Sequence, residues 1–174
     1  MDKTNIDKTI IYKNNIVAQV TAQLQEELSL ALVAADNAHK AATDDQSVAE
    51  TQYDTLAIEQ SYLAEGQSRR VDEIRYAIKC LATLPLEASL TSEKVVMGSL
   101  VQMEQDLAKQ QWFFIAPAAG GYRCQVTTGQ TLANITVITP QSPMGAALLN
   151  KVVDDDVIVA VGTKKICDYI VAIK

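Results

Sequence analysis

The sequence predicts an α+β protein in which an antiparallel coiled-coil helical hairpin precedes a mostly antiparallel sheet domain. Apolar residues recur at helical spacing through the first half of the chain, and β-rich runs separated by turn residues fill the second half. Proline and glycine divide the two halves, because no proline precedes Pro85 and Gly66 is the only glycine among the first 84 residues. Helix-permissive sequence followed by turn-rich sequence indicates two domains.

The size and composition of the chain set bounds on its class. With 174 residues, 48% of them apolar, it can form one ordinary domain or two small ones with a real core. No apolar stretch approaches the roughly 20 residues of a membrane span. The N-terminal run MDKTNIDKTIIYK also lacks the apolar segment of a signal peptide. We therefore expect a cytoplasmic protein without membrane contact.

The first helix is predicted from an apolar repeat with a step of four residues, flanked by alanines. Asn14 or Asn15, which precede the repeat, are the expected N-cap. The repeat consists of Ile16, Val20, Leu24, Leu28 and Leu32.

The second helix is predicted from steps that alternate between three and four residues, the rhythm of a coiled-coil seam. Each arm of the hairpin has about 26 residues and should extend about 40 Å. Gly66 interrupts the second arm at a cost of roughly 1 kcal/mol relative to alanine. Either close approach of the first helix or plain tolerance at an exposed position explains this glycine. The seam consists of Leu56, Gln60, Leu63, Gln67, Val71 or Arg70, Ile74, Ile78 and Leu81.

The second half predicts five or six strands and one short helix, with turns at AGGY and at Gly162. The run PMGAALLN is the expected helix. The domains follow as a hairpin over 1–84 with its tip at 43–54, a linker over 85–93, and a sheet domain over 94–174. The β-rich runs are KVVMGSLVQME, QWFFIAPA, RCQVTT, ITVITP, DDVIVAV and CDYIVAIK.

The cysteines and charges favour some functions over others. Cys80, Cys124 and Cys167 are widely spaced and accompany a single histidine, so we expect buried, reduced thiols and no zinc site. The net charge of −6 is concentrated in 1–84, which carries −5, against −1 in 85–174. An acidic hairpin is a poor surface for duplex nucleic acid and suits entry into a basic cavity, although ordinary solubility charge is the commoner explanation.

The C-terminal run ITPQSPMGAALLNKVVDDDVIV, together with the closing YIVAIK, resembles the Gre family of bacterial transcription elongation factors. The glycine that this family usually carries before the aspartate is replaced here by Asp154. The matching positions are Ser142, Pro143, Met144, Ala147, Leu148, Leu149, Lys151, Asp155, Val159, Tyr169, Val171 and Ile173.

The helical run YDTLAIEQSYLAEGQSRR resembles the same family, and most closely a divergent proteobacterial subgroup of Gre-like proteins. Together the two resemblances span about residues 45–174, and the C-terminal one is the more specific. The matching positions in the helical run are Tyr53, Gln60, Tyr62, Glu65, Gly66 and Arg69.

The resemblance implies a fold and a partner. The C-terminal domain should be FKBP-like and should dock on core bacterial RNA polymerase at the rim of its secondary channel, while the hairpin enters the channel. Nucleic acid would be met only indirectly, within the elongation complex. The expected docking residues are Gln141, Ser142, Pro143 and Met144, at the N-terminal end of the short helix. An ordinary strand-to-helix turn is the alternative.

The tip of the hairpin departs from the family. Gre factors stimulate cleavage of backtracked RNA through an Asp-x-x-Glu pair that holds a second Mg²⁺. Here the acidic tip offers Asp44, Asp45 and Glu50, of which no two are three residues apart. With a loop one residue longer, Asp45 and Glu50 would stand in and share a Mg²⁺ with the polymerase active site. The resemblance implies no stably bound cofactor and no intrinsic catalytic residue.

Three alternatives stay open. The chain could occupy the channel without stimulating cleavage, or be another coiled-coil interaction module that dimerises through its first helix. An FKBP-like domain could also be a peptidyl-prolyl isomerase, an idea based on fold analogy alone. The aromatic residues available to a prolyl pocket are Trp112, Phe113, Phe114, Tyr122 and Tyr169.

Overall fold

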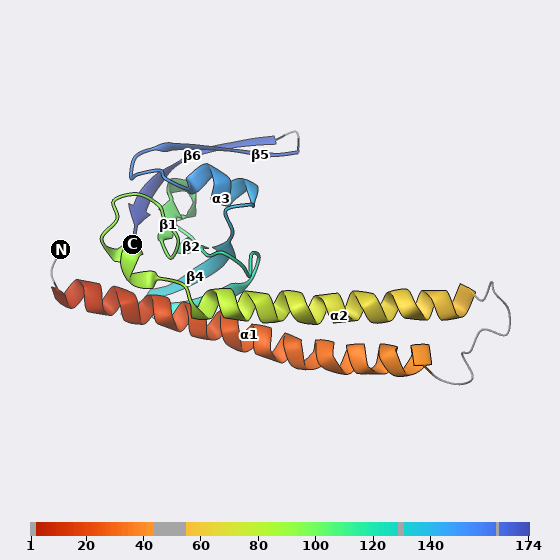
Figure 1. Ribbon diagram of the computed structural model, residues 1–174. Helices are drawn as coiled ribbons and strands as arrows, with labels where there is room; N and C mark the ends of the chain where they lie inside the picture. Colours follow the sequence, from red (N-terminus) through yellow and green to blue (C-terminus); the bar gives the residue numbers. More distant parts are fainter. Residues whose placement is uncertain (1–2, 44–54, 129–130, 163) are drawn as a thin grey trace. The chain divides into compact units, whose positions relative to one another are not determined.

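The computed structural model describes residues 3–43, 55–128, 131–162 and 164–174 (Figure 1). Two long helices, α1 (Lys3–Thr43) and α2 (Thr55–Ala82), precede six strands and a short helix, α3 (Pro143–Leu148). The expected α+β fold class is therefore confirmed. The chain forms two compact units, one of residues Ala22–Lys79 and one of Met1–Thr21 with Cys80–Lys174.

Helix α1 is longer than the sequence pattern indicates. It runs from Lys3 through Asn14 and Asn15, both exposed inside the helix, so the expected N-cap is wrong. The reason is Lys13, which is fully buried three residues before Ile16, on the same face of the helix. Because a lysine breaks the apolar repeat, the repeat appears in the sequence to begin only at Ile16.

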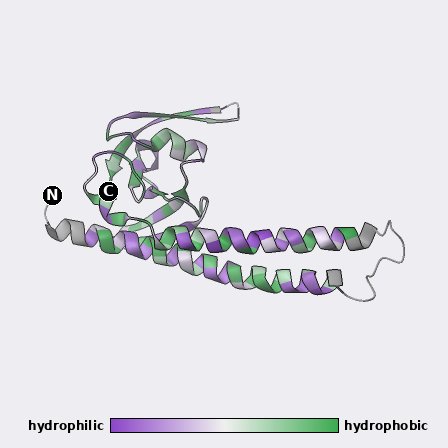
Figure 2. Cartoon of the chain, in the orientation of Figure 1, coloured by the Kyte–Doolittle hydropathy of each residue, from purple (hydrophilic) through white to green (hydrophobic). Residues whose placement is uncertain are grey.

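In the unit of residues Ala22–Lys79, the two helices pack side by side and antiparallel. Glu27 of α1 accepts a hydrogen bond from Arg70 of α2, so these two residues lie side by side in the helical pair. Hydrophobic and hydrophilic residues alternate along both helices (Figure 2). The buried apolar residues of this unit are Leu24, Ala31, Ala38, Val71, Ile74 and Ala77.

The expected stripe on α1 is correct at its start and wrong at its end. Leu24 is buried, but Leu32 is 42% exposed and Ala31 takes its place. A step of four residues turns a helix by about 40° more than one full turn, so four such steps carry a side chain about 160° around the axis. A strict four-residue repeat therefore cannot stay on one face, whereas Leu24, Ala31 and Ala38 keep a seven-residue spacing.

The expected seam on α2 is confirmed at Val71, Ile74 and Leu81, which are buried, and fails at Leu63, which is 56% exposed. Because Glu27 lies beside Arg70 in this antiparallel pair, Leu63 falls opposite the alanine-rich part of α1, where small side chains cover little of a leucine. Apart from the neighbouring backbone of its own helix, no described heavy atom would lie within 4 Å of a β-carbon at Gly66. Tolerance at an open position, not close helix approach, accounts for this glycine.

The other unit holds a six-stranded sheet in the order β3-β4-β2-β1-β6-β5. All pairings are antiparallel except β2 with β4, which is parallel because β3 lies beyond β4 at the edge. The strands are β1 (Leu100–Met103), β2 (Gln111–Ile115), β3 (Arg123–Thr128), β4 (Thr131–Ile138), β5 (Asp156–Val161) and β6 (Lys164–Ile173).

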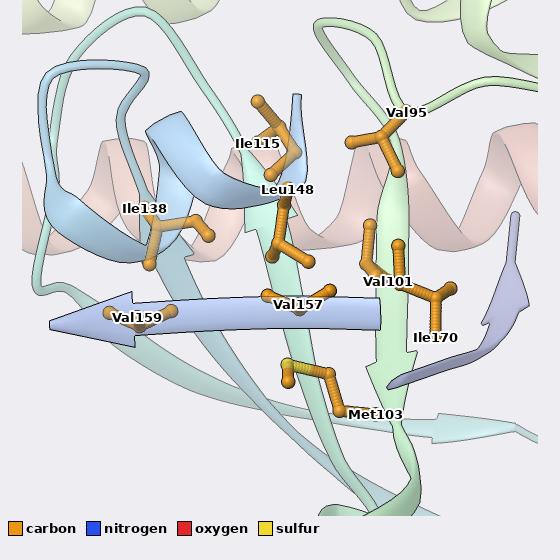
Figure 3. Close-up of a cluster of buried hydrophobic side chains, with 9 residues drawn as sticks. All are labelled: Val95, Val101, Met103, Ile115, Ile138, Leu148, Val157, Val159 and Ile170. Atoms are coloured by element: carbon orange, nitrogen blue, oxygen red, sulfur yellow. The ribbon is translucent and has the colours of Figure 1, made fainter. Parts of the chain in front are cut away.

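The core of this unit lies between the sheet and α3, where Leu148 points toward β5 above Val157 (Figure 3). Met144, Ala147 and Leu149 pack against the same core, so the helix is held on the sheet by its apolar side chains. The core residues are Val95, Val101, Met103, Ile115, Ile138, Leu148, Val157, Val159 and Ile170.

Two segments differ from the domain division that the sequence predicts. The first 21 residues belong to the unit that holds the sheet. Lys13, Ile16 and Val20 lie on one face of this part of α1, and all three are buried. Residues 85–93, expected as a linker, contain a short 3-10 helix (Leu86–Leu90) in which Leu86 and Ser89 are buried.

The three cysteines are free, but only Cys124 is buried. Burial raises the pKa of the Cys124 thiol to about 11, which keeps it protonated at neutral pH. Cys167 is exposed, so the expectation of burial is wrong there. Among the described residues, neither long helix has an apolar stretch sufficient to cross a bilayer.

Candidate functional site

The N-terminal end of α3 is built by hydrogen bonds of Ser142. The Ser142 backbone is extended, with φ −73° and ψ 149°, and its Oγ accepts a hydrogen bond from the Gly145 N–H at 3.1 Å. The same hydroxyl donates to the carbonyl oxygen of Thr139 at 2.7 Å. Ser142 is therefore a true N-cap that ties the helix to the end of β4.

Pro143 occupies the first helical position, where its fixed φ suits the helix and its missing N–H leaves no donor unsatisfied. Gln141 and Pro143 are exposed, Ser142 is half-buried, and Met144 turns toward the core. The structure thus brings all four expected docking residues to one helix end, but presents mainly Gln141 and Pro143. Met144 belongs chiefly to the packing beneath.

Gly145 is a requirement of this site that sequence reasoning missed. A β-carbon at this position would lie 2.0 Å from the carbonyl oxygen of Thr139, closer than any real contact. The helix can therefore approach the end of β4 only if residue 145 is glycine. A glycine one turn into a short helix was the available signal.

The residues after α3 hold the helix against the rest of the unit. Asn150, with φ 66°, ends the helix, and its N–H donates to the Val95 carbonyl at 2.9 Å. The Val95 N–H in turn donates to the Lys151 carbonyl at 2.8 Å. Asp155 accepts a hydrogen bond from the Val152 N–H at 2.9 Å and so closes the turn that leads into β5.

The backbone of Asp154, which stands where the resembling Gre sequences usually carry glycine, adopts a conformation that favours glycine. Its φ is 71°, in the left-handed region that favours glycine. The substitution therefore keeps the turn but places a side chain in a strained conformation.

The acidic tip lies outside the described residues. Asp44, Asp45 and Glu50 all fall within 44–54, so their arrangement, and with it the shared Mg²⁺ site, stays a prediction.

Lys13 and Ser89 form a buried polar pair that the sequence did not reveal. The Lys13 ammonium donates to Ser89 Oγ at 2.6 Å, and Ser89 Oγ lies 2.7 Å from the Leu86 carbonyl oxygen. Burial lowers the pKa of Lys13 to about 8. A serine beside a lysine of lowered pKa can be a nucleophile, but these two are 2% and 0% exposed and no substrate can reach them. We conclude that the pair is structural.

A small hollow of about 170 Å³ lies beside Trp112 and Lys174. The Lys174 ammonium sits 4.5 Å from the centroid of the Trp112 ring, and partial burial lowers the pKa of this lysine. The contact covers the aromatic ring rather than presenting it to a ligand.

Within the part of the chain that the structure describes, three of the aromatic residues weighed for a prolyl pocket lie in different surroundings. Phe114 is fully buried in the sheet unit, whereas Tyr169 is 41% exposed on β6. Trp112 lines the hollow beside Lys174, and neither Phe114 nor Tyr169 does. The isomerase alternative gains no support from this geometry.

The described residues therefore define a fold class: an α+β protein that combines a helical pair with a sheet unit presenting a capped helix end. Among solved structures, the chain is similar to the GreA factor homolog 1 (Gfh1) protein of Thermus thermophilus, at 21% identity and a TM-score of 0.33. That match covers 88% of this chain and 94% of the other.

Two further structures show the same level of similarity. The first is a structure of the transcription factor Gfh1, with 19% identity and a TM-score of 0.34. This match covers 88% of this chain and 92% of the other. Thermus aquaticus Gfh1 has 23% identity and a TM-score of 0.31, covering 87% and 92%. No protein-family model matches the chain, and no curated protein does. Similarity at this level leaves the functional question to the chain's own residues.

Proposed function

We propose that this chain regulates transcription elongation by binding core bacterial RNA polymerase and acting through its secondary channel. The observation that carries the proposal is the presented end of α3. Gln141 and Pro143 are exposed there, on a helix capped by Ser142 and packed on the core through Leu148. This end lies within the run that resembles the C-terminal domain of the Gre family.

The remainder of that run supports the proposal because it is built to hold the helix end in place. Asn150 and Lys151 exchange backbone hydrogen bonds with Val95, and Asp155 closes the following turn. A rigid, exposed helix end is a suitable surface for a protein partner, since little ordering is needed when the partner binds.

The helical pair is the part that would enter the channel in this proposal. Residues 1–84 carry a net charge of −5, which suits a basic passage. The chain would act in the cytoplasm, without catalytic activity or stably bound cofactor of its own. Asp45 and Glu50 would supply carboxylate oxygens toward a Mg²⁺ shared with the polymerase.

The first experiment measures binding of the full chain to core RNA polymerase. We expect Pro143→Ala to weaken binding by about tenfold, because in this proposal Pro143 is one of the few central anchors whose truncation costs more than about 1 kcal/mol. Pro85→Ala, which changes another exposed proline outside the motif, is the control and should bind like the unchanged chain. Circular dichroism establishes that both variants are folded.

The outcomes separate the partner from the docking residues. No binding of the unchanged chain sinks the proposal, and equal binding of Pro143→Ala sinks only the docking surface. A transcript-cleavage assay on a backtracked complex then tests the tip. RNA shortening that disappears in an Asp45→Asn, Glu50→Gln double variant identifies a cleavage factor, whereas binding without shortening identifies a channel-occupying modulator.

A further inference from the structure

Strand β5 ends the sheet, and its outer edge has no partner among the described residues. The Ile170 N–H donates to the Asp155 carbonyl at 3.2 Å. Because hydrogen bonds alternate along an antiparallel ladder, Val157 and Val159 then bond to β6. Asp156, Ile158 and Ala160 turn their backbone N–H and C=O groups toward the free edge.

This edge lacks the features by which proteins usually discourage pairing. The strand Asp156–Val161 contains no proline and no lysine, and its register with β6 is regular throughout. Ile158 is 62% exposed at the centre of the strand. An open, regular edge with an apolar centre is a template for another strand.

The outer face of the β5–β6 hairpin has a simple pattern of charge. Asp156 pairs with Tyr169 at one end, Ile158 with Cys167 in the middle, and Ala160 with Lys165 at the other end. All six residues are exposed. The face is therefore acidic at one end, apolar in the middle and basic at the other end.

Such a pattern is complementary to itself when two copies meet antiparallel. If Ile158 lies on the twofold axis opposite Ile158 of a second copy, then Asp156 lies opposite the second copy's Ala160. Lys165 of that copy stands one strand further on, with its Cα about 10 Å from that of Asp156, within reach of a lysine side chain. Because the intervening Ala160 has a small side chain, it does not block the lysine side chain from reaching Asp156.

We infer that a second copy of this chain is the partner of this edge, in an antiparallel β5–β5 dimer. The choice of a second copy rests on charge complementarity. A single register places the exposed isoleucines against each other and brings Asp156 to Lys165 at both ends. An unrelated extended peptide could form hydrogen bonds with the free backbone groups of β5, but its charges would match Asp156 and Lys165 only by chance. The inference does not depend on the proposed function.

Sedimentation equilibrium of the full chain over a range of concentrations tests the dimer directly. Masses should rise toward twice 18.9 kDa as the concentration increases. Ile158→Lys places two ammonium groups on the axis and should raise the dissociation constant by about tenfold or more. Ile11→Lys, which changes an isoleucine 67% exposed on α1, is the matched control and should leave dimerisation unchanged.

A charge exchange tests the register. Asp156→Lys and Lys165→Asp each set like charges against each other at both ends, so each variant alone should dimerise about tenfold more weakly. Mixing the two variants restores opposite charges at both ends of a heterodimer. The mixture should therefore associate as tightly as the unchanged chain, and high salt should weaken all charge-dependent differences.

Three results overturn the inference. One is a monomer at every concentration, and another is a dimer that Ile158→Lys does not weaken. The third is a mixture of the charge variants that associates no better than either variant alone, because that excludes the antiparallel register even if the edge is used.

Discussion

Asp154 is a residue at which the chain keeps a strained backbone. Its φ of 71° lies in the left-handed region, which costs most side chains about 1 kcal/mol relative to glycine. We expect Asp154→Gly to raise the free energy of unfolding by about 0.5 kcal/mol, after the greater freedom of glycine in the unfolded chain is subtracted. Urea unfolding measures the change.

The control is Asp156→Gly, two residues further on. This aspartate begins β5, where glycine gains nothing from its freedom and weakens the strand. Asp156→Gly should therefore lower the free energy of unfolding. If both variants change stability in the same direction, strain at Asp154 is not the cause.

Substitution by alanine is expected to change stability in opposite directions at Gly145 and at Gly66. Gly145→Ala drives a β-carbon to 2.0 Å from the Thr139 carbonyl oxygen, so α3 must move away from the end of β4. We expect a loss of about 2 kcal/mol or more. Gly66 lies in a helix interior, where a new β-carbon meets no described atom within 4 Å apart from the neighbouring backbone of its own helix, so Gly66→Ala should stabilise by about 1 kcal/mol. Thermal unfolding of both variants checks the signs.

At the scale of elements, the helical pair depends on a few well-buried side chains. Ile74 is 1% exposed, whereas Leu63 on the same helix is 56% exposed. Ile74→Ala should therefore cost about 2 to 4 kcal/mol, and Leu63→Ala less than about 1 kcal/mol. Denaturant unfolding followed by helical circular dichroism compares them, and equal losses would mean that the seam continues through Leu63 in solution.

The elements that the sequence predicts best are those set by local signals. Ser142 and Pro143 specify the start of α3 without help from the rest of the chain. The alternation of buried residues in β4 allows that strand to be predicted from the sequence. The start of α1 was misplaced because Lys13 is buried through tertiary contacts that no local pattern reveals.

The candidate site divides in the same way. Its position and its cap follow from the Ser-Pro pair, but the need for glycine at 145 arises from the approach of Thr139, which only the folded chain shows. Leu32 was expected in the seam because a four-residue repeat was extended too far. The period of a helix, not the count of leucines, decides which residues are buried.

At the scale of the whole molecule, Lys13 links the start of α1 to the segment after α2. Its ammonium donates to Ser89, 76 positions away in the sequence, within the unit that holds the sheet. Ser89 also lies 3.1 Å from the Gly98 carbonyl oxygen, so the hydroxyl keeps a partner if the lysine is replaced. No carboxylate forms an ion pair with Lys13 among the described residues. The fold therefore bears the desolvation cost of an uncompensated cation.

This arrangement predicts a definite pH dependence. Burial lowers the pKa of Lys13 to about 8, against 10.5 in the unfolded chain. Between these values the unfolded state binds more protons than the native state, so the contribution of Lys13 to stability rises with pH from about 8 to about 10.5. Below pH 8 both states are protonated and the penalty is constant. At about 1.4 kcal/mol per pKa unit, a shift from 10.5 to about 8 makes the penalty at most about 3.5 kcal/mol.

Lys13→Met isolates this effect, because methionine has a similar length and no charge. The variant should be more stable than the unchanged chain at pH 7, and the difference should shrink steadily as the pH is raised past 8 toward 10. Taking the difference between two chains removes the other lysines and tyrosines that titrate in this range. Lys8→Met, at an exposed position on the same helix, should change stability by less than about 0.5 kcal/mol at pH 7. If Lys13→Met is less stable than the unchanged chain at pH 7, the hydrogen bond to Ser89 stabilises the fold by more than the desolvation of the ammonium destabilises it. Lys13 would then have a net stabilising effect on the packing of α1.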